Sequence, residues 1–98
     1  MPGEVVLINS FEVQAADAEA FLAAWDRASD YLQSQPGYVD RALHQAVTPD
    51  AEFRFVNIAR WRTAEDFRAA TQSPEFREVT AGLAGYQSHP AVYRVVRS

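Results

Sequence analysis

Cysteine is absent from this 98-residue chain, which excludes a disulfide framework, a thiolate nucleophile and a thiolate metal site. A basic excess is also missing: 9 basic side chains face 13 acidic ones, and the net charge of -4 repels phosphate backbones, so we expect no nucleic-acid partner. The first residues contain only a short aliphatic run, 5–8, with no basic cluster before it. We therefore expect no signal peptide, no membrane partner and a cytoplasmic protein.

The residues that are present favour one globular domain spanning 1–98. Hydrophobic residues make up 48% of the chain and charged residues 22%, which is too apolar for disorder and too charged for a membrane span. A chain of this size has a poor surface-to-volume ratio, so oligomerisation would help it.

Hydrophobic periodicity predicts four strands and three helices. Alternation predicts strands over residues 4–13, 38–47, 52–62 and 87–96. Spacing of i, i+4, i+7 and i+11 predicts a helix that begins after Asp17 as N-cap and ends at Pro36 and Gly37. Thr63 and Ser73 are typical N-caps of two further short helices.

This order, β-α-β-β-α-β, predicts an α+β ferredoxin-like fold, a four-stranded antiparallel sheet with its helices on one face. The other face should then be polar, yet both faces of the strands are apolar at their centres, as Val56 and Ile58 show opposite Phe55 and Trp61. We therefore expect a homodimer in which two sheets cover each other.

One strand carries a polar residue in an apolar row. Alternation places Phe53, Phe55, Asn57, Ala59 and Trp61 on one face. A buried amide costs free energy unless its hydrogen bonds are made, so Asn57 requires either an internal partner or a ligand. Asn9 lies in a similar apolar setting and is one candidate for the internal partner.

Four segments carry a family likeness: the 36–38 turn, the VNIARW run at 56–61, and the helix starts at 63–67 and 73–77. Together they resemble the antibiotic biosynthesis monooxygenase (ABM) family of dimeric α/β barrels. The family contains quinone-forming oxygenases, heme degraders, isomerases and proteins of unknown role. The resemblance implies a dimeric barrel that binds a small molecule.

The motif pattern is most similar to the cofactor-independent, quinone-forming oxygenase of actinorhodin biosynthesis. The resemblance implies a catalytic set of Asn57, Trp61, Arg77 and His44, whereas Phe67 replaces the family's tyrosine. In the heme-degrading branch only Asn9 matches, and no axial histidine is present, so we expect no heme.

The leading hypothesis is therefore a monooxygenase that uses molecular oxygen to convert an aromatic polyketide-like phenol to a quinone without flavin or metal. Asn57 and Trp61 would donate to a phenolate, and Arg77 would neutralise charge. The two histidines lack the spacing of metal ligands, so we expect no metal. Expected substrate-binding residues are Asn9, Trp25, Phe53, Phe55, Phe67 and Tyr93.

Simpler roles stay open for each residue: a structural amide for Asn57, packing for Trp61, a solvated cation for Arg77 and an exposed strand-end imidazole for His44. Two other functions also stay open, a non-catalytic ligand-binding dimer and an isomerase or cyclase of the same fold.

Overall fold

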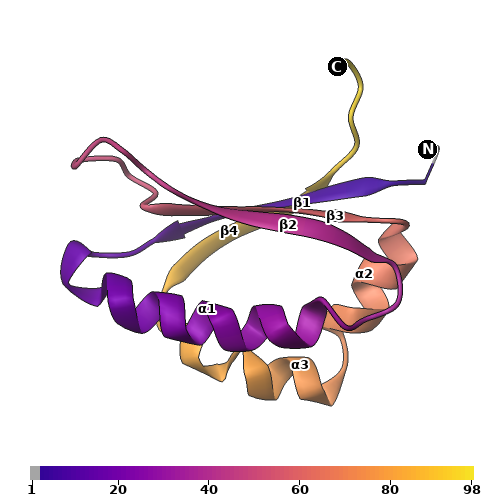
Figure 1. Cartoon of the computed structure of the whole chain (residues 1–98), viewed down its shortest axis with the longest axis horizontal. Coiled ribbons are helices and arrows are strands. Elements are labelled where there is room, and N and C mark those ends of the chain that lie inside the picture. Colours follow the sequence, from indigo (N-terminus) through magenta and orange to yellow (C-terminus); the bar gives the residue numbers. More distant parts are fainter. Residues whose placement is uncertain (1–2) are drawn as a thin grey trace.

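A computed structural model of the chain, which describes residues 3–98, has one sheet with all helices on one side (Figure 1). The strands are antiparallel in the order β2-β3-β1-β4. This arrangement confirms the predicted α+β ferredoxin-like βαββαβ fold. The elements are β1 Val5–Glu12, η1 Ala15–Asp17, α1 Ala18–Leu32, β2 Tyr38–Gln45, β3 Phe55–Trp61, α2 Ala64–Thr71, α3 Pro74–Val79, η2 Ala81–Leu83 and β4 Gln87–Tyr93, where η marks a 3₁₀ turn.

Two of the three predicted helix caps are confirmed. Thr63 accepts a hydrogen bond from the backbone N–H of Asp66 at 3.0 Å, and Ser73 accepts one from the N–H of Phe76 at 3.1 Å. Asp17 precedes α1, but the predicted side-chain cap is wrong. The turn η1 runs directly into α1 and gives Asp17 φ -98° and ψ 1°, instead of the extended backbone that a capping residue adopts.

All four strands are shorter than predicted, β1 by one residue at each end and the others by more. Gln45 and Phe55 form the last pair of β2 and β3, so residues 46–54 form the connecting loop. On the other edge Tyr93 pairs with Val6, and β1 begins only one residue earlier. Residues 95 and 96 therefore lie beyond the start of β1, and the C-terminal segment leaves the sheet (Figure 1).

The hydrophobic core is divided into two clusters along the strands. One contains Leu7, Ala59, Trp61 and Ala70, and the other contains Phe11, Val13, Phe21 and Phe55. The cross-strand row between them is the pair of Asn9 and Asn57. The two amides therefore lie where the apolar packing is interrupted.

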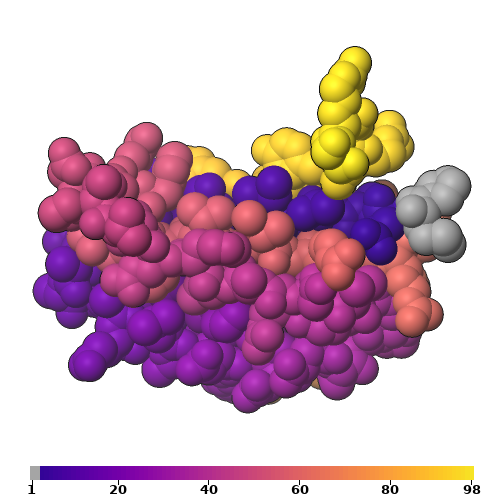
Figure 2. Space-filling model, turned by 45° about the horizontal axis from the view of Figure 1, so that its top comes forward, coloured from indigo at the N-terminus to yellow at the C-terminus, as the bar shows by residue number. Residues whose placement is uncertain are grey.

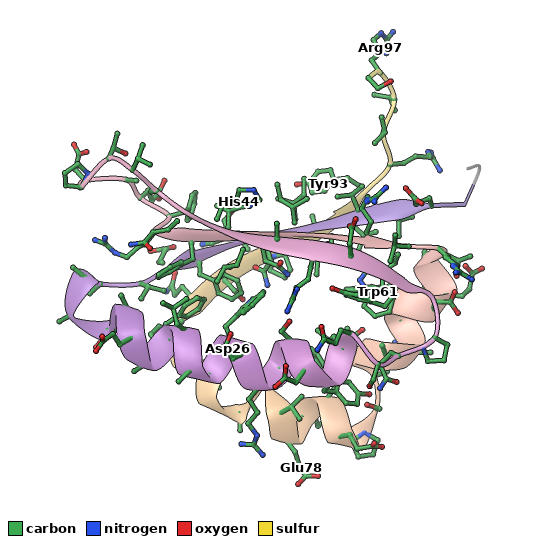
Figure 3. All side chains as sticks on the ribbon, viewed as in Figure 1. Asp26, His44, Trp61, Glu78, Tyr93 and Arg97 are labelled. Atoms are coloured by element: carbon green, nitrogen blue, oxygen red, sulfur yellow. The ribbon has the colours of Figure 1, made fainter. Side chains whose placement is uncertain are left out.

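No helix of the described residues covers the sheet face opposite α1, which we call the open face. Figure 2 turns this face toward the viewer, and Figure 3 shows His44 and Tyr93 on it. Ile58 is 37% exposed there and Tyr93 is 50% exposed. Arg60 forms ion pairs with Asp40 and Glu4 on this side, and its guanidinium lowers the pKa of the Asp40 carboxyl.

Within residues 3–98, no helix combines the length and the apolar character needed to cross a membrane.

Candidate functional site

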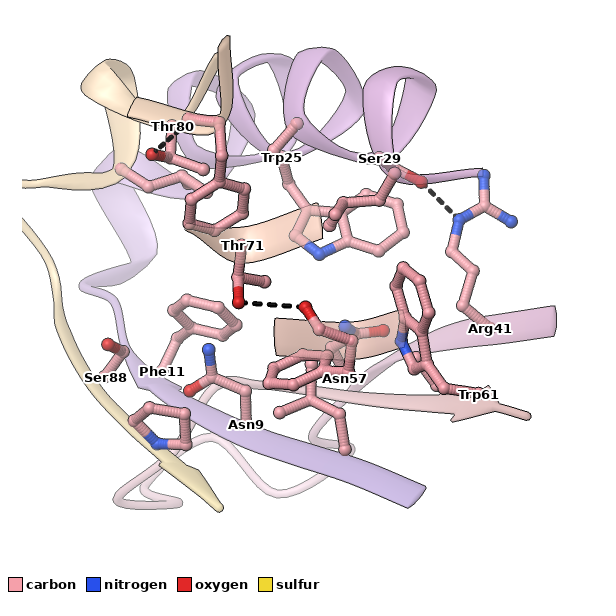
Figure 4. Close-up of a pocket in the computed structure, with 18 of the residues that line it drawn as sticks. Asn9, Phe11, Trp25, Ser29, Arg41, Asn57, Trp61, Thr71, Thr80 and Ser88 are labelled. Carbon is pink, nitrogen blue, oxygen red and sulfur yellow. Dashed lines mark hydrogen bonds between the residues drawn. The ribbon is translucent and has the colours of Figure 1, made fainter. Parts of the chain in front are cut away.

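A cavity of about 440 Å³ lies between the sheet and the helices (Figure 4). Its position follows from the divided core, because the asparagine row of β1 and β3 forms its floor and α1, α2 and α3 supply its walls. The walls are largely aromatic. The aromatic lining residues are Phe11, Trp25, Tyr38, Trp61, Phe67 and Phe76.

Three buried polar atoms on this cavity have no hydrogen-bond partner among the described residues. They are the side-chain oxygens of Asn9 and Asn57 and the indole nitrogen of Trp61. Each such atom costs about 1–3 kcal/mol when left unpaired. Asn9 is therefore not the internal partner of the Asn57 oxygen. It lies directly opposite Asn57 in the ladder, yet the side-chain oxygens of both residues remain unpaired in the described chain.

Trp61 is held by edge-to-face contacts with two other aromatic rings. Its ring centroid lies 5.6 Å from that of Tyr38 and 5.7 Å from that of Phe67, and the residue is only 1% exposed. These contacts fix the indole plane, so its N–H is a positioned donor at the cavity surface.

Arg41 also lines the cavity, and sequence reasoning missed it. Its Nε donates to the Ser29 hydroxyl on α1, and its guanidinium carbon lies 5.2 Å from the centroid of the Trp25 ring. The missing signal is a β-bulge between Tyr38 and Asp40. The bulge puts Tyr38 and Arg41 on the same face at a spacing of three, which strict alternation forbids.

Among the described residues, Arg41 is the one charged side chain that lines the cavity, and no carboxylate or imidazole does. General-base catalysis by a cavity residue therefore has no carboxylate or histidine to use. The arrangement instead offers donors and a cation to an oxygen-bearing aromatic ligand, in a cavity with largely aromatic walls.

The structure brings together half of the residues predicted for the site. Asn9, Trp25, Asn57, Trp61 and Phe67 all line the cavity.

The remaining predicted catalytic residues lie elsewhere. His44 is exposed on the open face, where its Nδ1 lies 3.2 Å from the carbonyl oxygen of Val56. Arg77 is exposed on α3 and does not line the cavity. The resemblance implied a catalytic role for His44, but its register partner Val56 belongs to the open face, so its side chain lies on the opposite side of the sheet from the cavity.

Three predicted substrate-binding aromatics are also outside the cavity. Phe53 lies in the loop before β3, with its ring 5.1 Å from that of His89. Phe55 is 1% exposed and stacks on Phe21 at 4.7 Å within the core. Tyr93 lies on the open face (Figure 3), because its register partner Val6 belongs to that face.

Comparisons with known proteins agree with this fold and identify a family. The sequence profile described as antibiotic biosynthesis monooxygenase matches residues 4–82. Deoxynogalonate monooxygenase of Streptomyces nogalater is 34% identical over 73 residues, which cover 74% of this chain and 59% of that protein. The chain thus matches less than two thirds of this relative's length.

Solved structures extend the likeness to the whole chain. SnoaB, a cofactor-independent oxygenase from Streptomyces nogalater, has a TM-score of 0.86 at 28% identity, with 98% of this chain and 96% of that chain covered. A Shewanella loihica protein gives 0.86 at 36% identity, with 98% and 97% covered. A dimeric ferredoxin-like protein from Bacteroides fragilis, with a TM-score of 0.69 at 14% identity and 95% and 97% covered, supports the fold alone.

These matches confirm the family resemblance predicted from the sequence. The relative that they identify is deoxynogalonate monooxygenase, and they give no particular support to the predicted similarity to the actinorhodin enzyme. The chain belongs to the antibiotic biosynthesis monooxygenase family.

Proposed function

We propose that this protein is a cofactor-independent monooxygenase that oxidises a planar aromatic phenol of polyketide type to a quinone. The observation that carries the proposal is the set of three unpaired polar atoms, on Asn9, Asn57 and Trp61, in one aromatic cavity. A flat ligand with hydroxyl substituents would pair these atoms, because a hydroxyl can donate to the amide oxygens and accept from the indole N–H, and it would fill the gap in the core. The cofactor-independent oxygenase SnoaB, which shares the fold, supports the same activity.

The reaction balances without an external reductant. A ring CH₂ of the substrate becomes C=O, one atom of O₂ enters this carbonyl, and the other atom leaves as water with the two hydrogens. The substrate supplies all four electrons. Because a phenolate gives an electron to oxygen more readily than a phenol does, the protein has to favour the anion.

In the cavity, hydrogen-bond donors would favour the phenolate anion without a general base. The indole N–H of Trp61 can donate to the phenolate oxygen, and the side-chain NH₂ of Asn57 can do so when the amide turns this group toward the ligand; such donors lower the pKa of the bound phenol. A single positioned donor of this kind contributes about 3–4 kcal/mol in known oxyanion sites. His44 and Arg77, which the resemblance assigned to catalysis, take no part in the proposal because neither lines the cavity.

The decisive experiment is oxygen uptake with 1,8-dihydroxyanthrone under ¹⁸O₂, using protein treated with a metal chelator and freed of flavin. We expect uptake above that of boiled protein and one ¹⁸O atom in the new carbonyl. Uptake at the boiled-protein rate would refute the proposal. Product formation without oxygen would instead identify an isomerase or cyclase.

A homodimer is part of the proposed working form. The open face presents Ile58 at 37% exposed beside partly buried Ile8 and Val56, and no described element covers it. An identical apolar face on a second copy would bury this surface with a two-fold arrangement.

A second function is favoured by Phe67, which has no hydroxyl where the family resemblance places an active-site tyrosine. The same cavity would then bind an aromatic ligand without oxidising it. Thermal stabilisation by 1,8-dihydroxyanthraquinone, with no oxygen uptake from the anthrone, would distinguish this binding function from the oxygenase.

A further inference from the structure

Arg41 is a cation on the cavity wall without an anionic partner. Within the described chain, the ion pairs involve Arg60 and His89, and no carboxylate lies within 4.0 Å of Arg41. The chain has more acidic than basic side chains, 13 against 9, so carboxylates are not scarce in the protein as a whole. Among the described residues, they are missing from the part of the cavity wall around Arg41.

The guanidinium is nevertheless held in a fixed position. Its Nε donates to Ser29, which is itself only 4% exposed, and its face lies over the Trp25 ring at 5.2 Å. Arginine has five N–H donors, and Nε supplies only one of them. The two terminal NH₂ groups retain the paired geometry that binds a carboxylate through two parallel hydrogen bonds.

Arg41 and the unpaired amides occupy different parts of the same cavity. Arg41 pairs with Ala59, so its strand position lies between the rows of Asn57 and Trp61. Its side chain reaches up to α1, whereas the asparagines remain on the sheet floor (Figure 4). A ring system on the floor would therefore place its hydroxyl groups against the amide oxygens of the asparagines and one further substituent against Arg41.

We infer that Arg41 is a specificity residue that binds a carboxylate substituent on the aromatic substrate, which makes this protein selective for aromatic acids over their neutral analogues. The inference rests on the proposed function in taking the cavity as the substrate site. It adds the chemical class of the substrate and the residue that selects it.

The test compares two ligands that differ only in the acid group, 1,8-dihydroxyanthraquinone and its 3-carboxylic acid. Both are already quinones, so their binding is measured by calorimetry without turnover. We expect the wild-type protein to bind the acid about tenfold more tightly. Arg41→Gln should abolish this preference, because its affinity for the acid should fall about tenfold more than its affinity for the neutral quinone.

Two variants separate recognition from folding. Arg41→Lys keeps the charge and should retain part of the preference, although it loses the bidentate geometry. Arg27→Gln removes an equal charge from an exposed position on α1 and should retain the full preference. The preference should also weaken as salt is added, because salt screens a partly exposed ion pair.

Several results would overturn the inference: equal binding of the two quinones by the wild type, binding of neither, or an equal loss for both ligands in Arg41→Gln. The proposed function fails separately, by absence of oxygen uptake. A preference for the acid in a protein that consumes no oxygen would support the inference and refute the oxygenase.

Discussion

Asn9 and Asn57 are direct cross-strand partners in β1 and β3, yet each has a buried side-chain oxygen with no hydrogen bond in the described chain. An adjacent pair of amides would satisfy each other if their role were structural. Their unpaired atoms lie instead on a cavity that separates the two halves of the core. This pattern is typical of a site that sacrifices stability for ligand binding.

Replacing Asn57 by the similarly sized Leu should therefore stabilise the ligand-free protein. The change removes an unpaired buried amide, so the free energy of unfolding should rise by about 1–3 kcal/mol, while oxygen uptake falls about 100-fold. Urea unfolding at fixed protein concentration measures the first quantity. Asn9→Leu is the matched variant on β1. A loss of stability in both variants would mean that the amides are structural.

Trp61→Phe isolates the indole N–H from the ring. The phenyl ring preserves part of the contact with Tyr38 and Phe67, but it has no donor. We expect kcat for anthrone oxidation to fall about 100-fold with little change in KM, because the donor acts on charge that develops during the reaction. Tyr86→Phe removes a polar hydrogen from an aromatic residue outside the cavity and should leave kcat unchanged. Equal rates for wild type and Trp61→Phe would exclude the donor role.

The fold was predictable because each element has a local signal. Gly37 has φ 88°, the left-handed geometry expected where the first helix turns into β2. Thr63 and Ser73 mark both later helix starts through hydroxyls that cap free N–H groups. The strand ends were less predictable, because they depend on which partner strand is present. Residues 95 and 96 have good strand composition but lie beyond the start of β1.

The site was predictable only where alternation is regular. In β3 the faces follow strict alternation, so Asn57 and Trp61 were correctly placed on the helix side. In β2 the bulge after Tyr38 shifts the faces, which hid Arg41. Phe55 shares the face of Asn57, but packing against Phe21 takes it into the core, and no sequence pattern distinguishes these outcomes.

Ser73→Ala should destabilise the protein more than Thr63→Ala. The Ser73 hydroxyl caps α3 and also lies 2.5 Å from the hydroxyl of Tyr31 on α1, whereas Thr63 only caps α2. We expect losses of about 2 kcal/mol and about 1 kcal/mol in urea unfolding. In the background of Tyr31→Phe the two losses should become similar, because the contact between helices is already gone. Equal losses in the wild-type background would show that the Tyr31 contact contributes nothing.

Ile58→Asp should convert the proposed dimer to a monomer. Ile58 lies at the centre of the open face, where its register partners are Ile8 and Ala42. A carboxylate there would be buried without a partner in a sheet-to-sheet dimer, and its desolvation outweighs the apolar contact that remains. Sedimentation velocity should give a mass near twice 11.0 kDa for the wild type and near 11.0 kDa for the variant. Ala23→Asp, at an exposed position of α1, is the control and should remain dimeric. A wild type that sediments as a monomer, or a variant that stays dimeric, would show that the open face is not the subunit interface.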